Sequence, residues 1–117
     1  MKIRDYFGEN FEEEEVQIER HLYKYGNRLM LGLIGVYDGE REPYATLTVN
    51  LENEENVDVN EAFVDVNNLT DARGFIERYG LGVPTGRIAR SGYCEYPLYR
   101  FDLEKIDKLE QEGRKNK

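Results

Sequence analysis

Apolar and polar side chains alternate one by one along residues 44–51, where Ala45, Leu47, Val49 and Leu51 fall on one side of an extended chain. A period of two is typical of a β-strand that buries one face and exposes the other. The pattern therefore predicts a strand at 44–51 with these four side chains directed inward. An isolated strand is not stable in water, so this segment needs pairing partners elsewhere in the chain.

Three further segments have strand-like composition: 16–23, 28–37 and 62–67. Residues 28–37 are apolar on both sides of the alternation, which indicates a strand covered on both faces. Gly32 and Gly35 interrupt this segment, and they indicate a bulge or a place where backbone or a large ring lies close. We expect the four consecutive strands to pair as an antiparallel meander.

The hydrophobic period changes after the fourth predicted strand. Four residues there recur three and four positions apart: Ala72, Phe75, Ile76 and Tyr79. This spacing predicts a short helix over residues 70–79, with Asn68 or Thr70 as its N-cap and Gly80 as its left-handed stop.

A glycine-rich stretch and a second aromatic segment follow. Residues 80–92 contain four glycines and one proline, a composition that favours a loop between the helix and the next strand. Residues 93–101 have strand-like, aromatic composition, and Pro97 restricts this strand to a sheet edge or a break.

The last predicted element is a helix that starts at Asp102, whose carboxylate serves as the N-cap. Phe101 and Ile106 occupy the two positions of a hydrophobic staple. Gly113 is expected to end the helix.

The resulting order, β-β-β-β-α-β-α, predicts an α+β fold. We expect a mainly antiparallel sheet of four to five strands with two helices packed on one face. A chain of 117 residues has the usual size of one domain, so residues 1–117 are predicted to form a single unit. The ends, 1–12 and 114–117, are expected to be flexible.

Composition excludes several classes of function. The formal net charge of −8 argues against direct binding of nucleic acid, which requires clustered basic residues. No apolar run is long enough to span a membrane, and no secretory signal is visible. Cys94 is the single cysteine, which excludes an internal disulfide and a cysteine-rich zinc site. We therefore expect a cytoplasmic protein with no cofactor and no metal.

The charge is unevenly distributed. Residues 1–62 carry 6 basic and 15 acidic side chains, a net charge of −9, whereas residues 63–117 carry 10 and 9, a net charge of +1. Between Arg73 and Arg100 all the basic residues are arginines, interleaved with tyrosines. The two halves therefore suggest different contact surfaces.

The Arg/Tyr segment is the first candidate site. Its residues are Arg87, Arg90, Tyr93, Tyr96, Tyr99 and Arg100. Tyrosine and arginine are enriched at protein-binding hot spots, so we expect a protein-binding module with a protein partner and no enzymatic activity. Strand alternation cannot place every ring on one side, and at least two rings are expected to complete the core.

The acidic half supplies an alternative. Glu52, Glu54, Glu55 and Asp58 lie in an acidic connector, and a second acidic tract covers residues 12–15. Carboxylates held in position can imitate the phosphates of DNA and occupy the basic groove of a nucleic-acid enzyme. A solvated surface that keeps the protein in solution is the simpler interpretation of the same residues.

Two catalytic or ligand-binding alternatives have weaker support. The glycines of residues 80–92 suggest an anion-binding loop, with Arg87 and Arg90 as clamps for a phosphorylated small molecule, but the spacings of known phosphate-binding motifs are absent. Cys94 and His21 are the one thiol and the one imidazole, and no third residue that would orient such a pair is identifiable. Cys94 is expected to pack in the core beside Tyr96 and Leu98.

Several short segments also resemble a known family: Tyr44-Ala45-Thr46-Leu47-Thr48-Val49-Asn50, Val64-Asp65-Val66-Asn67-Asn68, Gly80-Leu81-Gly82 with Thr85-Gly86-Arg87, and Ser91-Gly92-Tyr93-Cys94-Glu95-Tyr96-Pro97. The family comprises short uncharacterised bacterial proteins from plasmids, phages and conjugative elements of Firmicutes and gut bacteria. The resemblance covers residues 28–103. It implies no activity and no functional residue, but it implies an accessory role in a mobile element, such as inhibition of a defence system.

Overall fold

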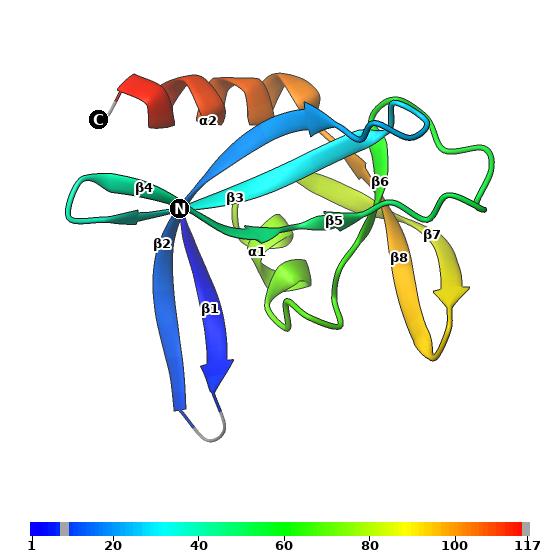
Figure 1. Ribbon diagram of the computed structural model, residues 1–117, viewed down its shortest axis with the longest axis horizontal. Coiled ribbons are helices and arrows are strands. Elements are labelled where there is room, and N and C mark those ends of the chain that lie inside the picture. The colour runs from blue at the N-terminus through cyan, green and yellow to red at the C-terminus, as the bar shows by residue number, and fades with distance from the viewer. Residues whose placement is uncertain (8–9, 116–117) are drawn as a thin grey trace.

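The computed structural model of the protein describes residues 1–7 and 10–115. Its strands form two antiparallel four-stranded sheets (Figure 1). The first sheet follows chain order: β1 (Lys2–Phe7), β2 (Asn10–Leu22), β3 (Leu29–Tyr37) and β4 (Glu40–Thr46). The second has the order β5 (Thr48–Val49), β6 (Glu61–Val64), β8 (Cys94–Phe101) and β7 (Gly82–Ser91). The helices are α1 (Ala72–Arg78) and α2 (Leu103–Lys115).

The predicted α+β class with antiparallel strands is confirmed, but the strands divide between two sheets where one meander was expected. The division falls inside the predicted strand 44–51, at Leu47. The Leu47 N–H donates to the Leu31 carbonyl of β3 at 2.8 Å, and the Leu47 carbonyl accepts from Asp65 N–H at 2.9 Å. This buried residue therefore joins the two sheets, while Ala45, Val49 and Leu51 are only half-buried.

The β3–β4 hairpin confirms the expectation raised by the glycines of β3. A register shift occurs between Leu33 and Ile34, and a Cβ added at Gly35 would lie 2.7 Å from the Tyr37 ring. The two strands are joined by Asp38 and Gly39, whose φ angles of 51° and 82° fit a type I′ turn. A bulge therefore occurs opposite β3, with Tyr44 of β4 as the extra residue, and a ring lies close to Gly35.

The glycine-rich residues 80–92 form strand β7, so the predicted loop is wrong over most of its length. A bulge between Pro84 and Ile88 lets the strand absorb a proline and the positive-φ Gly86 (φ 93°). Within the bulge, the Thr85 hydroxyl donates to the Leu98 carbonyl of β8 at 3.0 Å and accepts from Arg87 N–H at 3.1 Å. The side chain thereby replaces backbone pairing that the bulge removes.

The first helix is shorter than predicted. Asp71 occupies the N-cap position of α1, so the predicted caps Thr70 and Asn68 are wrong, and the Asp71 side chain makes no capping hydrogen bond. Gly80 has φ 60° and ends the helical turn as expected. Figure 1 shows α1 between the β1–β2 and β7–β8 hairpins, which extend to the same side of the molecule.

The second helix begins as predicted and ends later. Asp102 Oδ1 accepts from Lys105 N–H at 3.2 Å, and both staple residues, Phe101 and Ile106, are buried in one core cluster. Gly113 lies inside α2, where it does not end the helix. A Cβ there would lie 3.0 Å from Gln17 Cδ, so the glycine permits α2 to approach β2 closely.

Two hydrophobic clusters hold the fold together. The larger fills the space between the sheets and the helices, and it includes Leu47, Phe75 and Phe101. The smaller consists of Phe63, Ala89 and Leu98, on the other face of the second sheet. The second sheet is therefore covered on both faces.

The N-terminal segment is part of the first sheet, although no element was predicted before residue 16. Strand β1 pairs with β2 in register, Lys2 opposite Glu15, and Ile3 is buried. The terminal amine of Met1 lies 3.0 Å from Glu15 Oε1. Among the described residues, no helix is long and apolar enough to cross a membrane.

Candidate functional site

The six predicted Arg/Tyr residues do not form one surface, because both faces of β8 pack against protein. Tyr99 is buried in the larger cluster and Tyr96 is half-buried against the smaller one. Burial raises the pKa of the Tyr96 hydroxyl, and the neighbouring Cys94 raises it further. The expectation that at least two rings serve the core is met by this pair, with Cys94 half-buried beside Tyr96.

Arg87 links the second sheet to the acidic segment between β5 and β6, residues 50–60, which we call the connector. Its guanidinium donates to Glu54 Oε1 at 3.2 Å and to the Asn56 carbonyl at 3.1 Å. It also lies over the Phe63 ring, 5.5 Å from the centroid, in cation–π geometry. These contacts hold the connector over the smaller cluster, to which Leu51 and Val57 contribute.

A second arginine fixes the other side of the connector. Arg28 donates from Nη1 to the Leu51 carbonyl at 2.6 Å and from Nη2 to the Glu54 carbonyl. Of the four predicted acidic residues, Glu54 is thus half-buried and paired, whereas Glu52, Glu55 and Asp58 are exposed. The connector is acidic on its outer side and anchored by arginines on its inner side.

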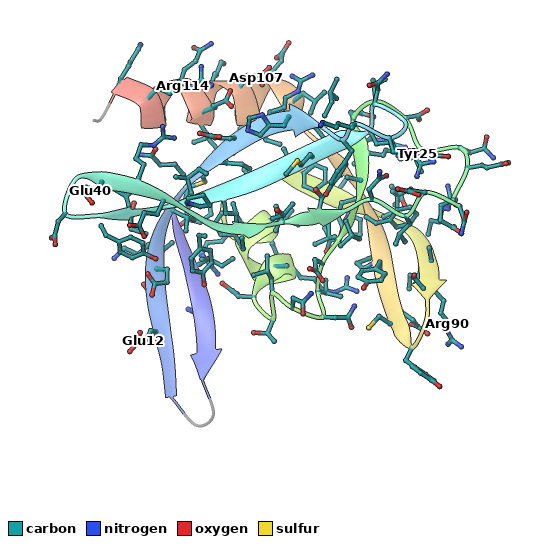
Figure 2. All side chains as sticks on the ribbon, viewed as in Figure 1. Glu12, Tyr25, Glu40, Arg90, Asp107 and Arg114 are labelled. Atoms are coloured by element: carbon teal, nitrogen blue, oxygen red, sulfur yellow. The ribbon has the colours of Figure 1, made fainter. Side chains whose placement is uncertain are left out.

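The exposed end of the β7–β8 hairpin, which we call the hairpin tip, carries Ile88, Arg90 and Tyr93. Ser91 pairs with Cys94, so Gly92 and Tyr93 form a two-residue turn, and the φ of 62° at Gly92 fits a type II′ geometry. Tyr93 is fully exposed and Ile88 is more than half exposed. Arg90 lies 2.7 Å from Glu95, and its position near the tip is labelled in Figure 2.

The opposite end of β7 and β8 borders a surface hollow. One part, of about 560 Å³, is lined by Asp58, Val59, Asn60, Phe101, Asp102, Leu103 and Glu104. An adjoining part, of about 370 Å³, shares Asn60, Phe101 and Asp102 and adds Val83 and Arg100. Arg100 is paired with the buried Glu61 carboxylate at 3.3 Å.

His21 and Cys94, the candidate nucleophilic pair, lie on strands of different sheets. The nucleophile hypothesis requires a contact between His21 and Cys94. The Nε2 atom of His21 instead lies 3.0 Å from Glu19 Oε2, so the imidazole is paired with a carboxylate. The hydrogen bond from His21 lowers the pKa of Glu19, and Arg41 adds to the effect. Within the described part of the chain, no group of three His, Cys, Asp or Glu side chains is placed to hold a metal ion.

Sequence reasoning missed the apolar residues at both ends of the β7–β8 hairpin: Val59, Val83 and Ile88. A signal was available, since Val57 and Val59 are the two apolar residues of the acidic, polar stretch 52–61 and Ile88 lies between Arg87 and Arg90. Reading residues 80–92 as a loop hid the alternation that exposes Val83. An apolar residue isolated in a polar segment is therefore worth considering as a contact residue.

Comparison with known proteins gives one match. Residues 17–116 match a domain of unknown function, DUF4313. No curated protein and no solved structure matches the chain. The predicted resemblance to an uncharacterised family is confirmed in this form, and the match extends beyond the predicted 28–103 at both ends.

Proposed function

The chain belongs to the DUF4313 family, whose function is unknown, and we propose that it is a protein-binding module whose contact surface is the hairpin tip. The observation that carries this proposal is the full exposure of the Tyr93 ring in a two-residue turn. Tyrosine has only two main side-chain torsions, so it loses little side-chain entropy when a partner covers it. Its hydroxyl and its ring supply a hydrogen bond and a large apolar area together.

The edge of the second sheet supports the same surface. Strand β7 is the last strand of that sheet, and among the described residues no strand pairs with its outer edge. Pro84 and the bulge interrupt its ladder, which limits strand addition near the middle of β7. The regular stretch 88–91 beside Tyr93 is the part of the edge best suited to a partner strand.

Arg90 adds a charged group to the hairpin tip. Its side chain is 72% exposed, and an ion pair this exposed contributes little to stability, so Glu95 can release it to a partner at small cost. The resemblance to proteins of bacterial mobile elements suggests where this module acts. On that basis it is an accessory protein in a bacterial cytoplasm, without catalytic activity, whose partner is a protein of the host or of the element.

Site-specific crosslinking tests the proposal. A photoreactive phenylalanine analogue replaces Tyr93, and the same analogue replaces Tyr25, an exposed tyrosine in the β2–β3 turn, as the matched control. After irradiation in cells of the source organism, we expect a defined adduct from position 93 only. Identical adducts from both positions, or none from position 93, would contradict the hairpin tip as a contact surface.

Once the crosslinked protein is purified, titration calorimetry measures its affinity for the chain. Replacing Tyr93 by Ala is expected to weaken binding by about 10- to 100-fold, the usual effect of removing an aromatic anchor. Tyr25→Ala is the control and is expected to leave the dissociation constant unchanged. Equal affinities for wild type and Tyr93→Ala would remove the ring from the interface.

A DNA-mimicking inhibitor is the second candidate, and one observation favours it. The exposed carboxylates of Glu52, Glu55 and Asp58 lie on a connector that Arg28 and Arg87 fix in place, and mimicry requires fixed charges. The test is displacement of a labelled DNA duplex from a nuclease of the same host. Mimicry predicts displacement that weakens as salt rises and disappears when the three residues are replaced by Lys. No displacement at low salt excludes mimicry for that nuclease.

A further inference from the structure

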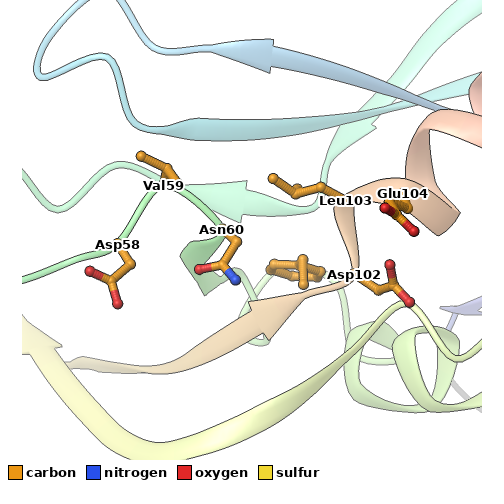
Figure 3. A pocket seen from close by; sticks show the side chains of 7 residues that line it. Asp58, Val59, Asn60, Asp102, Leu103 and Glu104 are labelled. Carbon is orange, nitrogen blue, oxygen red and sulfur yellow. The ribbon is translucent and has the colours of Figure 1, made fainter.

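The hollow at the start of α2 lies at the end of β7 and β8 that is opposite the hairpin tip. Figure 3 shows Asp58, Val59 and Asn60 of the connector on one side of it and the first residues of α2 on the other. The floor includes Phe101, the last residue of β8. The two parts share Asn60, Phe101 and Asp102 as lining residues and therefore adjoin each other.

The walls of the hollow are fixed by hydrogen bonds. Phe101 N–H donates to the Asn60 carbonyl at 2.8 Å, which ties the connector to β8. Asp102 N–H donates to the Leu81 carbonyl at 2.8 Å, and its carboxylate caps α2. A ligand therefore meets a preformed surface, which lowers the entropic cost of binding.

Two valines make the hollow apolar. Val59 is 85% exposed on the connector side and Val83 is 60% exposed on the β7 side. Single exposed apolar residues are common, but here Val59 borders one part together with Phe101 and Leu103, and Val83 borders the adjoining part. Covering these side chains removes apolar area from water, at about 25 cal/mol for each Å².

The charge around the hollow is acidic. Asp58, Asp102 and Glu104 are exposed at its rim. Two nearby cations offset this charge only in part: Arg100 is paired with Glu61, and Lys105 lies beside Gly80, which lines the adjoining part of the hollow. The site thus combines an apolar floor with carboxylates that attract positive charge and repel nucleic acid.

From this combination we propose that the hollow binds a basic peptide segment of a partner protein. An aliphatic side chain of that segment packs between Val59 and Leu103, and its flanking Lys or Arg side chains meet the carboxylates of Asp58 and Glu104. The charge complementarity selects this occupant over an acidic or uncharged segment. The proposal is independent of the hairpin tip, which lies at the other end of β7 and β8.

Fluorescence anisotropy with labelled model peptides tests this inference on the intact chain. The probe is a short peptide with a central leucine flanked by lysines. One companion peptide has serine in place of leucine, and another has glutamates in place of the lysines. We expect saturable binding of the first peptide, at least tenfold weaker binding of the serine peptide, and no binding of the acidic one.

Variants locate the site. Val59→Ser, which keeps the charge of the rim, is expected to weaken binding of the leucine peptide roughly tenfold, the effect of losing one buried aliphatic contact. Ile88→Ser at the hairpin tip is the matched control and is expected to have no effect. The double variant Asp58→Asn with Glu104→Gln should weaken binding and reduce its salt dependence. The pair Glu52→Gln with Glu112→Gln makes the same charge change outside the hollow.

Three results would overturn the proposal. Equal affinity for the leucine and serine peptides would show attraction by net charge alone. A loss of binding in Ile88→Ser with none in Val59→Ser would move the peptide to the hairpin tip. Absence of saturable binding by the leucine peptide to the folded wild-type chain would exclude the site. None of these results would contradict an adduct from position 93, so the two proposals fail separately.

Discussion

Arg87 on β7 and Glu54 in the connector are joined by a charge-assisted hydrogen bond of 3.2 Å, which fastens an acidic surface segment to the second sheet. The same guanidinium covers the Phe63 ring and reaches the Asn56 carbonyl. The sequence predicts Arg87 as a binding residue, and in the structure its side chain holds the connector against the second sheet. Arg90, predicted with it, makes only an exposed pair.

We therefore expect the two arginines to differ in their effect on stability. Arg87→Ala should lower the free energy of unfolding by about 1–2 kcal/mol, because it removes a cation–π contact and two hydrogen bonds. Arg90→Ala should change it by no more than about 0.5 kcal/mol. Urea unfolding followed by circular dichroism measures both. Equal losses in the two variants would contradict the anchoring role.

Hydrogen exchange gives a local readout of the same contact. In Arg87→Ala the amides of the connector, residues 50–60, should exchange faster, while those of β2 and β3 keep their protection. Arg90→Ala is the control and should leave the pattern unaltered. Unchanged exchange in the connector of Arg87→Ala would mean that Arg28 alone holds it.

The glycines of β7 should also respond unequally to substitution. A Cβ at Gly82 would lie 2.5 Å from the Arg100 carbonyl oxygen, a backbone atom that cannot move aside. Gly82→Ala is expected to destabilise the protein by about 2–4 kcal/mol. Gly86→Ala meets no atom within 4 Å and costs only its positive φ, about 1 kcal/mol. Thermal unfolding of both variants compares them, and a larger loss in Gly86→Ala would refute the packing argument.

Substitution of Asp71 is expected to lower the stability of the protein more than substitution of the exposed acidic residue Asp107. Its carboxylate is 7% exposed, accepts from Arg4 N–H at 2.9 Å and lies 2.7 Å from Arg78 Nη2. The hydrogen bond to Asp71 raises the pKa of Arg78. Asp71→Asn should cost about 1.5–3 kcal/mol in denaturant unfolding, because it removes a charge from a nearly buried pair.

Asp107 provides the control for Asp71. It pairs with Arg20 at 2.8 Å, yet its side chain is 44% exposed. Asp107→Asn should change the stability by less than about 1 kcal/mol, as is usual for surface pairs. If both substitutions had the same cost, burial of Asp71 would not be the reason for its importance.

Acid should weaken the first sheet through Glu19. The hydrogen bond from His21 lowers the pKa of this carboxyl in the folded state, with Arg41 contributing, against a smaller opposing effect of burial. A lowered folded-state pKa gives stability that is fully present above the unfolded-state pKa of about 4.5 and is lost as the pH falls through the folded-state value.

Glu19→Gln should therefore reduce stability at pH 7 and have a diminishing effect below about pH 4.5. Urea midpoints for wild type and variant across this range measure the difference. Glu42→Gln, an exposed glutamate of β4, is the control. A constant difference between wild type and Glu19→Gln at all pH values would rule out the titration of Glu19 as its source.

The elements that could be predicted from the sequence are those decided by local chemistry. Asp102 caps α2 because a short carboxylate side chain reaches the free amides of the first turn, whatever the rest of the fold does. Gly80 ends α1 for a similarly local reason, its positive φ. These features need no knowledge of distant neighbours.

The break at Leu47 could not be predicted, because the alternation of residues 44–51 is the same whether one sheet or two receive the strand. Strand β7 was not predicted because glycines and a proline are unfavourable in a strand. They are accommodated by a bulge in which the Thr85 hydroxyl donates a hydrogen bond to the Leu98 carbonyl. The predicted site residues divide for a related reason. Tyr99 is buried because distant segments cover its face of β8, whereas Tyr93 lies in the turn before β8 and is exposed.

The position of Leu47 restricts how the family can vary in length. The Leu47 N–H donates to Leu31 of β3 and its carbonyl accepts from Asp65 N–H. The chain therefore passes from one sheet to the other within this single residue. One residue inserted between Leu47 and β5 would turn each β5 side chain to the opposite face of the sheet. Homologous chains are therefore expected to gain and lose residues in the connector, and to keep a constant spacing from β3 to β5.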